Sequence, residues 1–192
     1  MSTPALVLAS SSPRRRDLLA RIGAAPARIE SPDIDESPLT GELPRAYALR
    51  LAQAKAAAVN RHEGEIVLAG DTTVAVGRRI LPPAETEAIQ RELLGLISGR
   101  RHRCISAVCL IDTAGKARTR VVETVVTFKR LTPDEIDAYV ASGEGLGKAG
   151  GYAIQGRAEA LIRYVAGSHS AVIGLPLFET RALLKAAGYP LG

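Results

Sequence analysis

The chain has 192 residues, of which 46% are hydrophobic, and it carries a formal net charge of +5 and no Trp. Its length fits one domain over residues 1–192, and the lack of any apolar run near ~20 residues excludes a helical membrane span. The charge favours an anionic partner, but the scarcity of aromatic stacking side chains argues against nucleic acid and leaves a small polyanion.

Strand-like and helix-like segments alternate along the chain, which predicts an α/β fold. In chain order, the patterns predict strands at 6–9, 27–30, 65–68, 72–76, 79–81, 103–111, 118–129 and 161–165. They predict helices at 13–22, 44–60, 84–97 and 176–187, and one that begins after Thr132. Thr132 is a strong N-cap, because Pro133 follows it and Glu135 lies three residues further on. The Gly-rich stretch 143–156 is expected to be a loop.

The two cysteines, Cys104 and Cys109, fall in one predicted strand at an odd separation. Their side chains are therefore expected to point to opposite faces of the sheet, where they cannot form a disulfide. Packed thiols of this kind are typical of a reducing compartment. The apolar run 4–9 has no basic segment before it and is too short for a signal-peptide core. We therefore expect a chain that starts at or near Met1 and stays in the cytoplasm.

The first predicted helix carries an unusual charge pattern. Ser12 before Pro13 favours a helix start, and Arg14, Arg15 and Arg16 fill the first turn. Positive charge at this end opposes the helix dipole, whereas a bound polyanion would reverse the sign of that interaction. Because the helix directly follows a buried strand, where ligands of open α/β sheets commonly bind, we favour a phosphate grip. The alternative is a helix start with solvated arginines.

Two glycine patterns resemble phosphate-binding loops but lack the context of such loops. Gly145, Gly147 and Gly150 match G-x-G-x-x-G, but a polar helix end precedes them where a strand is required. The segment 143–148 is one residue short of a P-loop and has no Ser or Thr after its lysine. We interpret neither pattern as a phosphate site.

Acidic side chains provide candidates for catalysis. Asp71 follows the apolar strand 65–68 after a short Ala-Gly step, and its carboxylate is a metal ligand, a general base or a turn former. Asp33, Asp35 and Glu36 form a second acidic group in a loop, where solvated carboxylates are equally common. Together with Asp71 this group could hold Mg²⁺, which takes one or two carboxylates plus substrate phosphate oxygens.

The basic side chains and histidines allow fewer assignments. Lys55 lies on the apolar stripe of the Ala-rich helix, where it either snorkels to solvent or reaches into a cleft to neutralise phosphate. The run 100–103, with its three arginines, is typical of a solvated turn. Histidine chemistry is not expected, because His62, His102 and His169 are scattered and have no nucleophile or ligand spacing.

Several segments, taken in order, resemble the motifs of Maf-type nucleoside triphosphate pyrophosphatases. They are 8–15, 33–36, 51–56, 70–72, 98–100, 148–156 and 174–176. The resemblance runs from about Ala5 to Tyr189, and the ordered set is far more specific than any one motif. It implies a mixed, elongated and twisted sheet flanked by helices, with two lobes and a substrate cleft between them, as in inosine triphosphatase-like proteins.

The resemblance also implies an activity and its residues. The family hydrolyses nucleoside triphosphates between the α- and β-phosphates, gives the monophosphate and pyrophosphate, and uses a divalent metal such as Mg²⁺, Mn²⁺ or Co²⁺. It implies catalytic roles for Asp71, Glu36 and Lys55, with Asp71 as general base and with Asp71 and Glu36 at the metal. It implies phosphate or nucleotide contacts from Ser10, Arg14, Arg15, Thr72, Lys148 and Gln155. A homodimer and the removal of non-standard or excess nucleotides are implied as well.

The nucleotide preference also comes from the resemblance. Arg14, Thr72 and Gln155 fall where the dTTP/UTP-preferring branch places its specificity residues, and 152–156 resembles that branch rather than the one that acts on 7-methyl-GTP. Gln155 suits a pyrimidine, because its amide offers both a donor and an acceptor to the base edge.

One position departs from the family pattern. Pro83 stands where the family usually has a lysine, so one phosphate contact is missing unless Arg78, Arg79 or Lys148 supplies it. Gly147 also stands where the family often has an aspartate. The loss of an electrostatic contact to the transition state can lower a rate by orders of magnitude. The alternative function is therefore a nucleotide-binding protein with weakened catalysis, for which the resemblance implies a regulatory role in septum formation or cell division.

Overall fold

The computed structural model describes residues 3–191. Its strands are β1 (Ala5–Ala9), β2 (Arg28–Glu30), β3 (Glu65–Val76), β4 (Arg79–Leu81), β5 (Arg101–Ile111), β6 (Ala117–Phe128) and β7 (Ile162–Ala166). Its helices are α1 (Pro13–Arg21), α2 (Pro44–Ala58), α3 (Glu87–Ile97), α4 (Pro133–Ala141), the 3₁₀ helix η1 (Arg157–Leu161), α5 (His169–Ile173) and α6 (Leu177–Ala186). Of these elements, η1 and α5 are the two that the sequence patterns did not predict.

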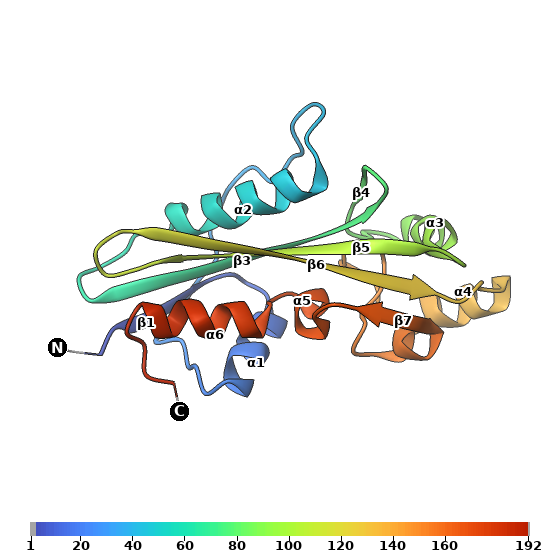
Figure 1. Ribbon diagram of the computed structural model, residues 1–192. Coiled ribbons are helices and arrows are strands. Elements are labelled where there is room, and N and C mark those ends of the chain that lie inside the picture. The colour runs from blue at the N-terminus through green and yellow to red at the C-terminus, as the bar shows by residue number, and fades with distance from the viewer. Residues whose placement is uncertain (1–2, 192) are drawn as a thin grey trace.

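The seven strands form one mixed sheet in the order β2-β1-β3-β5-β6-β7, with β4 paired to β3. β1 is parallel to β2 and β3, whereas β5, β6 and β7 continue the sheet antiparallel. Figure 1 shows β3, β5 and β6 as long, twisted strands that connect an end with β1, α1 and α6 to an end with α3, α4 and β7. The predicted mixed, elongated sheet with two lobes is confirmed.

β3 is one continuous strand, so the predicted break between 68 and 72 is wrong. It pairs with β5 without interruption from Val67 to Ala75. Asp71 therefore lies in the middle of a strand. The sequence pattern had placed it beyond the end of the strand 65–68. The polar residues 71–73 suggested the end of a strand. In the structure their side chains form hydrogen bonds within the protein, so a strand segment with polar side chains can be buried here.

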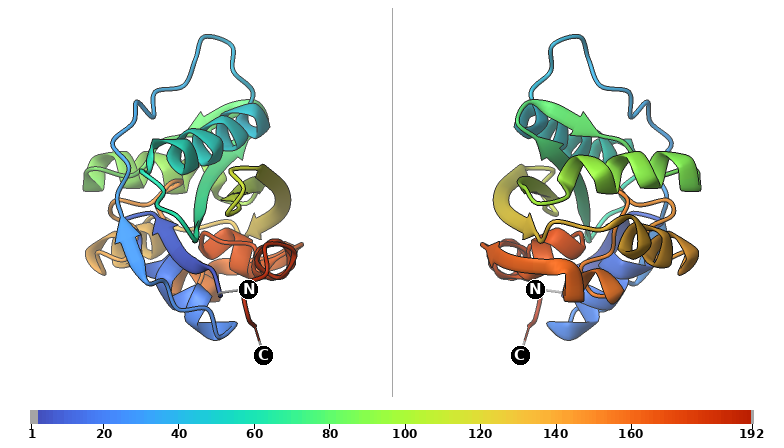
Figure 2. Two further views of the ribbon diagram at one scale, coloured as in Figure 1. Left: turned by 90° about the vertical axis from the view of Figure 1, so that its left-hand side faces the viewer. Right: turned by 90° about the vertical axis from the view of Figure 1, so that its right-hand side faces the viewer.

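The strand geometry sends neighbouring side chains of β3 to opposite faces of the sheet. Asp71 faces α2, because it bonds Lys55 there, and Thr73 shares that face. Val74 belongs to the cluster that contains side chains of α1, α5 and α6, and Thr72 shares its face. Figures 1 and 2 show α2 on one side of the sheet and α1, α5 and α6 on the other. The layer under α2 consists mainly of small side chains: Val7, Ala9, Ala48, Ala52, Ala56, Val67, Ala69, Ala75 and Ala107. Because alanines fill this layer, α2 lies close to the sheet and a polar side chain on α2 reaches β3.

Two local predictions are confirmed by contacts. The Thr132 hydroxyl accepts from the Glu135 N–H, and the Glu135 carboxylate accepts from the Thr132 N–H, which completes a capping box at α4. Cys104 and Cys109 are free, buried thiols on opposite faces of β5, each in a different hydrophobic cluster. Among residues 3–191, no helix has the length and apolar character needed to cross a membrane.

Candidate functional site

Two cavities meet at the middle of β3. The first, here called the cationic cavity, has polar lining residues from α1, β3 and the loop before η1: Ser12, Arg14, Arg15, Thr72, Lys148 and Gln155. The second, the acidic cavity, is lined from the loop before α2, from α2 and from β3 and β4: Glu36, Ser37, Pro38, Tyr47, Thr73, Ile80, Leu81 and Pro82. Asp71, Thr72, Pro83 and Ala149 line both cavities. The candidate site therefore straddles the central strand.

Lys55 joins the two carboxylates of the acidic cavity. It is only 8% exposed, and its Nζ donates to Oδ1 of Asp71 at 2.9 Å and to Oε2 of Glu36 at 2.8 Å. The other oxygen of Asp71 accepts from the Thr73 hydroxyl at 3.2 Å. Of the two alternatives for Lys55, snorkelling to solvent or reaching into a cleft, the geometry matches the second.

The acidic loop contributes one of its three carboxylates to this cluster. Glu36 reaches Lys55, whereas Asp35 turns back and accepts from the N–H of Ser37 at 2.8 Å. Neither Asp33 nor Asp35 lines the two cavities. The loop is held to α2, because the Tyr47 hydroxyl donates to the Glu36 carbonyl at 2.8 Å. Sequence reasoning missed Tyr47, because it lies outside the motif segments and its role depends on a contact with the distant residue Glu36.

Arg14 and Arg15 cross from α1 to α5. The Nε of Arg14 donates to the Ile173 carbonyl at 3.3 Å, and the Nε of Arg15 donates to the Gly174 carbonyl at 2.9 Å. Arg15 also donates to the Ser10 hydroxyl at 2.9 Å. Burial lowers the pKa of the Arg15 guanidinium, and the negative charge of Asp71 opposes that change. These bonds fix both guanidinium groups in place at the cavity and leave further N–H donors for an anion.

The helix start itself differs from the prediction. The Ser12 hydroxyl makes no capping bond, and the Ser12 N–H instead donates to the Ser10 hydroxyl at 3.2 Å. Arg16 is well exposed and forms an ion pair with Asp17 at 3.8 Å. A helix advances about 100° per residue, so three consecutive arginines cannot face one cavity. The arginines at the site are thus Arg14 and Arg15.

The remaining expected nucleotide contacts, Thr72, Lys148 and Gln155, also line the cationic cavity. The Thr72 hydroxyl is 2.6 Å from the Ser106 hydroxyl, and Gln155 is exposed to the cavity. Burial, and next the charge of Arg14, lower the pKa of the Lys148 ammonium. The structure thus gathers Arg14, Arg15, Thr72, Lys148 and Gln155 around one cavity, although they come from three distant parts of the chain. Ser10 does not line the cavity; it is buried, and its hydroxyl accepts from Arg15.

Pro83 lies directly beside the loop that carries Lys148. It forms an isolated antiparallel bridge with Ala149, and the Ala84 N–H donates to the Lys148 carbonyl at 3.1 Å. Arg79 instead forms an ion pair with Glu92 at 3.1 Å and lines neither cavity. Among the three basic residues considered as substitutes for the missing lysine, Lys148 is the one that lines the same cavity as Pro83.

Two sequence interpretations concern segments near the cationic cavity, 100–103 and 145–150. The run 100–103 is not a solvated turn, because β5 begins at Arg101 and His102 is only 2% exposed. The Nε2 of His102 lies 2.7 Å from the Tyr152 hydroxyl. The two arginines flanking His102 are two residues apart and lie on one face of β5, so His102 lies on the other, buried face. The glycine pattern of 145–150 is confirmed as a loop, between α4 and η1.

The two carboxylates at the acidic cavity fit a divalent cation only if a bound phosphate supplies further oxygen ligands. No cluster of three or more His, Cys, Asp or Glu side chains with metal-binding geometry occurs in residues 3–191. Glu36 and Asp71 nevertheless converge on one ammonium group. Mg²⁺ commonly takes one or two carboxylates and completes its shell with water and phosphate oxygens. The two carboxylates therefore fit such an ion when a phosphate is bound.

Comparison with known proteins places the chain among relatives along nearly its whole length. The sequence model described as Maf-like protein matches residues 5–187. A dTTP/UTP pyrophosphatase of Sphingopyxis alaskensis is 68% identical over 98% of this chain and 100% of its own. A protein of the same name from Caulobacter vibrioides is 57% identical over 97% of each chain.

The fold also has a distant structural relative. The Ham1 protein of Staphylococcus aureus matches with a TM-score of 0.50 and 13% sequence identity, over 95% of this chain and 98% of that one. At this identity the similarity concerns the fold alone.

Proposed function

The chain belongs to the Maf-like protein family, and on that premise we propose that it is a nucleoside triphosphate pyrophosphatase that favours dTTP and UTP. It splits the α–β phosphoanhydride and yields the nucleoside monophosphate and pyrophosphate. The observation that carries the proposal is the buried Lys55, which holds Asp71 and Glu36 together beside a cavity lined by Arg14, Arg15 and Lys148. This arrangement offers cations to phosphates and a carboxylate to water.

Each group has a distinct part in this proposal. Ser10, Arg14, Arg15 and Lys148 bind the phosphates, while Thr72 and Gln155 contact the nucleotide. The Asp71 carboxylate accepts the proton of the attacking water as a new P–O bond forms and pyrophosphate leaves with the bridging oxygen. Lys55 keeps Asp71 in position through the bond to Oδ1.

A divalent cation completes the proposed site. Asp71 and Glu36 would hold Mg²⁺, Mn²⁺ or Co²⁺, which supplies positive charge to the triphosphate when bound. The acidic cavity supports this assignment, because its two carboxylates share one lysine and would otherwise repel a triphosphate.

Pyrophosphate release tests the proposed function. The parent protein is incubated with a panel of nucleoside triphosphates and Mg²⁺ or Mn²⁺, and we expect release to be fastest with dTTP and UTP. Asp71→Asn keeps the shape of the side chain but removes the base, and it should lower kcat by at least about a hundredfold. Equal activity of the parent and Asp71→Asn, or no release from dTTP and UTP, would overturn the proposal.

The position of Pro83 supports weakened catalysis. Together with the family resemblance, it motivates a second candidate, a nucleotide-binding regulator of septum formation or cell division. Pro83 lines both cavities and adds no charge where a phosphate is expected. Tight nucleotide binding without turnover, with turnover gained in Pro83→Lys, would favour this candidate over the enzyme.

We also propose that the protein acts in the cytoplasm as a homodimer. The free thiols of Cys104 and Cys109 suit a reducing compartment. Phe178, which is 83% exposed, is a large apolar side chain that a partner subunit could cover. Light scattering of the parent and Phe178→Ser tests the dimer: a parent that scatters as a monomer at micromolar concentration contradicts it.

A further inference from the structure

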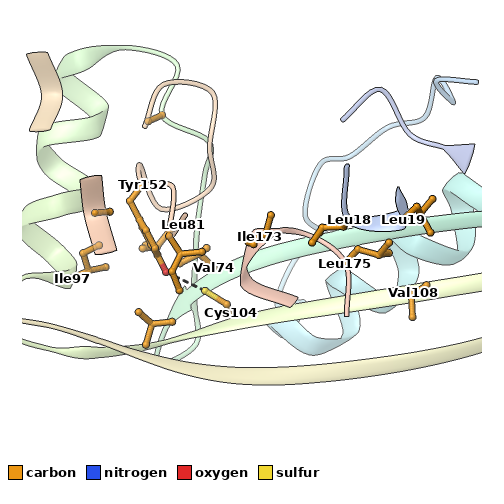
Figure 3. Close-up of a cluster of buried hydrophobic side chains, with 14 of the residues drawn as sticks. Leu18, Leu19, Val74, Leu81, Ile97, Cys104, Val108, Tyr152, Ile173 and Leu175 are labelled. Atoms are coloured by element: carbon orange, nitrogen blue, oxygen red, sulfur yellow. Dashed lines mark hydrogen bonds between the residues drawn. The ribbon is translucent and has the colours of Figure 1, made fainter. Parts of the chain in front are cut away.

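A buried aromatic cluster lies directly behind the wall of the cationic cavity. Tyr152 is 5% exposed and lines that cavity, and its hydroxyl lies 2.7 Å from the Nε2 of His102 and 3.3 Å from the Sγ of Cys104. Figure 3 shows the Tyr152 side chain extending toward Cys104, with Val74 and Leu81 beside it. Phe128 closes the cluster, with its ring centre 5.0 Å from that of Tyr152. The ring of Tyr152 is thus clamped on several sides.

His102 is the polar anchor of this cluster. Burial lowers its pKa to about 4, so the ring is neutral at physiological pH and can share one hydrogen with the Tyr152 hydroxyl. Its other nitrogen, Nδ1, is buried and has no hydrogen-bond partner among the described residues. A buried nitrogen without a partner costs stability, so the position of His102 calls for an explanation.

Two further buried side chains hold the neighbours of Tyr152. The Nε2 of Gln90, on α3, donates to the Gly151 carbonyl at 3.1 Å. The Tyr139 hydroxyl, on α4, accepts from the Ala153 N–H at 3.0 Å. Three consecutive residues of one loop are therefore each fixed by a buried polar side chain from a different element.

The clamped residues lead directly to the side chain that faces the nucleotide. Gln155 follows Ala153 by two residues, is exposed, and lines the same cavity as Tyr152. Most groups expected to hold phosphate belong to another part of the chain: Ser10, Arg14 and Arg15 to the β1–α1 segment. Lys148 precedes the clamped residues in the same loop, where its carbonyl accepts from the Ala84 N–H at 3.1 Å. A change at His102 therefore reaches Gln155 through the loop, while Arg14 and Arg15 stay fixed by the Ile173 and Gly174 carbonyls.

We propose that His102 is a positioning residue for nucleobase choice, which acts through the Tyr152 hydroxyl to fix the loop that presents Gln155. This inference rests on the proposed function, because it assigns the cavity wall at Gln155 to the base. It predicts that loss of the His102–Tyr152 bond weakens recognition of the pyrimidine and leaves phosphate recognition intact.

The experiment compares His102→Phe with the parent on UTP, dTTP and GTP, using inorganic tripolyphosphate as an inhibitor without a base. In His102→Phe we expect kcat/KM for UTP to fall about fivefold, mainly through KM, as for the loss of one hydrogen bond. The value for GTP and the inhibition constant of tripolyphosphate should each stay within about twofold of the parent. His102→Gln, whose amide can bond the Tyr152 hydroxyl, should recover most of the preference for UTP.

Two more variants separate this role from a general loss of packing. Tyr152→Phe removes the same bond from the other side, so the double variant should show no further loss of preference for UTP. Cys109→Ala is the matched control, because Cys109 is equally buried in β5 but faces α2. It should lower stability without changing the ratio of UTP to GTP.

Several outcomes would overturn the inference. An unchanged UTP/GTP ratio in Tyr152→Phe and His102→Gln would do so even if His102→Phe fails to fold. An equal loss for UTP and tripolyphosphate would show a structural role only. If the parent releases no pyrophosphate, the proposed function fails, and calorimetric binding of UTP and tripolyphosphate to the same variants then tests the inference separately.

Discussion

Lys55 and Asp71 form a buried ion pair, with 2.9 Å between Nζ and Oδ1 and side chains that are each only 9% exposed. The two residues come from different elements, α2 and β3, and Glu36 joins them from a third segment. Because the pair is shielded from water, each partner depends on the other for compensation of its charge.

Removal of the ammonium group should therefore destabilise the fold and abolish turnover. For Lys55→Met we expect the free energy of unfolding to fall by about 3 kcal/mol, because Asp71 is left as an uncompensated buried charge. Urea unfolding and pyrophosphate release measure the two effects. Lys185→Met, on an exposed position of α6, is the control and should change neither. A fully stable and active Lys55→Met would contradict the proposed arrangement.

Arg15 and Arg16 offer a matched pair of adjacent arginines. Arg15 is bonded to Ser10 and Gly174 at the cavity, whereas Arg16 is exposed beside Asp17. Arg15→Gln should raise KM for UTP at least about tenfold, because a charge-assisted bond to phosphate is lost. Arg16→Gln should stay within about twofold of the parent, since exposed charges contribute little. Steady-state kinetics decides, and equal effects of the two changes would argue against the phosphate grip.

The loop that carries Glu36 should depend on its contacts with α2. Arg50 donates to both carboxylate oxygens of Glu42 at 2.7 Å and to the Ser37 carbonyl at 3.0 Å, beside the bond from Tyr47 to Glu36. Arg50→Met should expose the loop to limited proteolysis and raise the Mg²⁺ concentration at half-maximal rate.

The control for the loop is Arg45→Met on the same helix, because Arg45 is exposed and pairs with Glu123 on β6 instead. The prediction fails if proteolysis of segment 31–43 proceeds at the same rate in the parent and in both variants.

The pH dependence of stability should carry a contribution from His102. The folded protein lowers its pKa from 6.5 to about 4 by burial, so below pH 6.5 the unfolded chain binds the proton first. Above pH 6.5 His102 is neutral in both states and does not lower the free energy of unfolding. As the pH falls from 6.5 toward about 4, the free energy of unfolding decreases by up to about 3 kcal/mol. Urea unfolding between pH 7.5 and 4.5 should show a shallower slope for His102→Phe. His62→Gln, on an exposed position, should keep the slope of the parent.

Alanine substitutions at two glycines of the loop before η1 distinguish backbone strain from steric crowding of the new side chain. Gly150 and Gly147 have similar positive φ angles, 73° and 69°. A Cβ at Gly150 would lie 2.9 Å from Cγ1 of Val74, whereas a Cβ at Gly147 meets nothing within 4 Å. Gly147→Ala should therefore cost about 1 kcal/mol of backbone strain, and Gly150→Ala clearly more. Equal midpoints of thermal unfolding for the two variants would show that the loop does not press against β3.

Much of the fold follows from local patterns. The apolar runs, the Pro-headed helix starts and the Thr132 capping box indicate most elements within a few residues of their observed ends. The continuity of β3 does not follow from them, because polar residues at 71–73 resemble a strand end. They are accommodated by Lys55 and Ser106, which lie far away in sequence.

The candidate site likewise has features that the sequence predicts and features that only the structure shows. Asp71, Glu36, Lys55, Arg14 and Arg15 are identifiable from motif order, which is a property of the sequence. Their mutual distances are not, because Lys55 could equally have snorkelled to solvent and Arg16 could equally have joined the grip. The positions of Tyr47 and His102 carry no local signal of function and became apparent only from their partners.

The sequence alone determined the family, the α/β class and the residue types of the site, because these depend on local pattern and motif order. The tertiary structure decided which charges meet. Small side chains under α2 bring Lys55 to β3, the strand alternation sends Asp71 and Thr72 to opposite faces, and α5 anchors both arginines. These contacts join segments that are 16 to 159 residues apart, and their energies depend on burial, which no local pattern encodes.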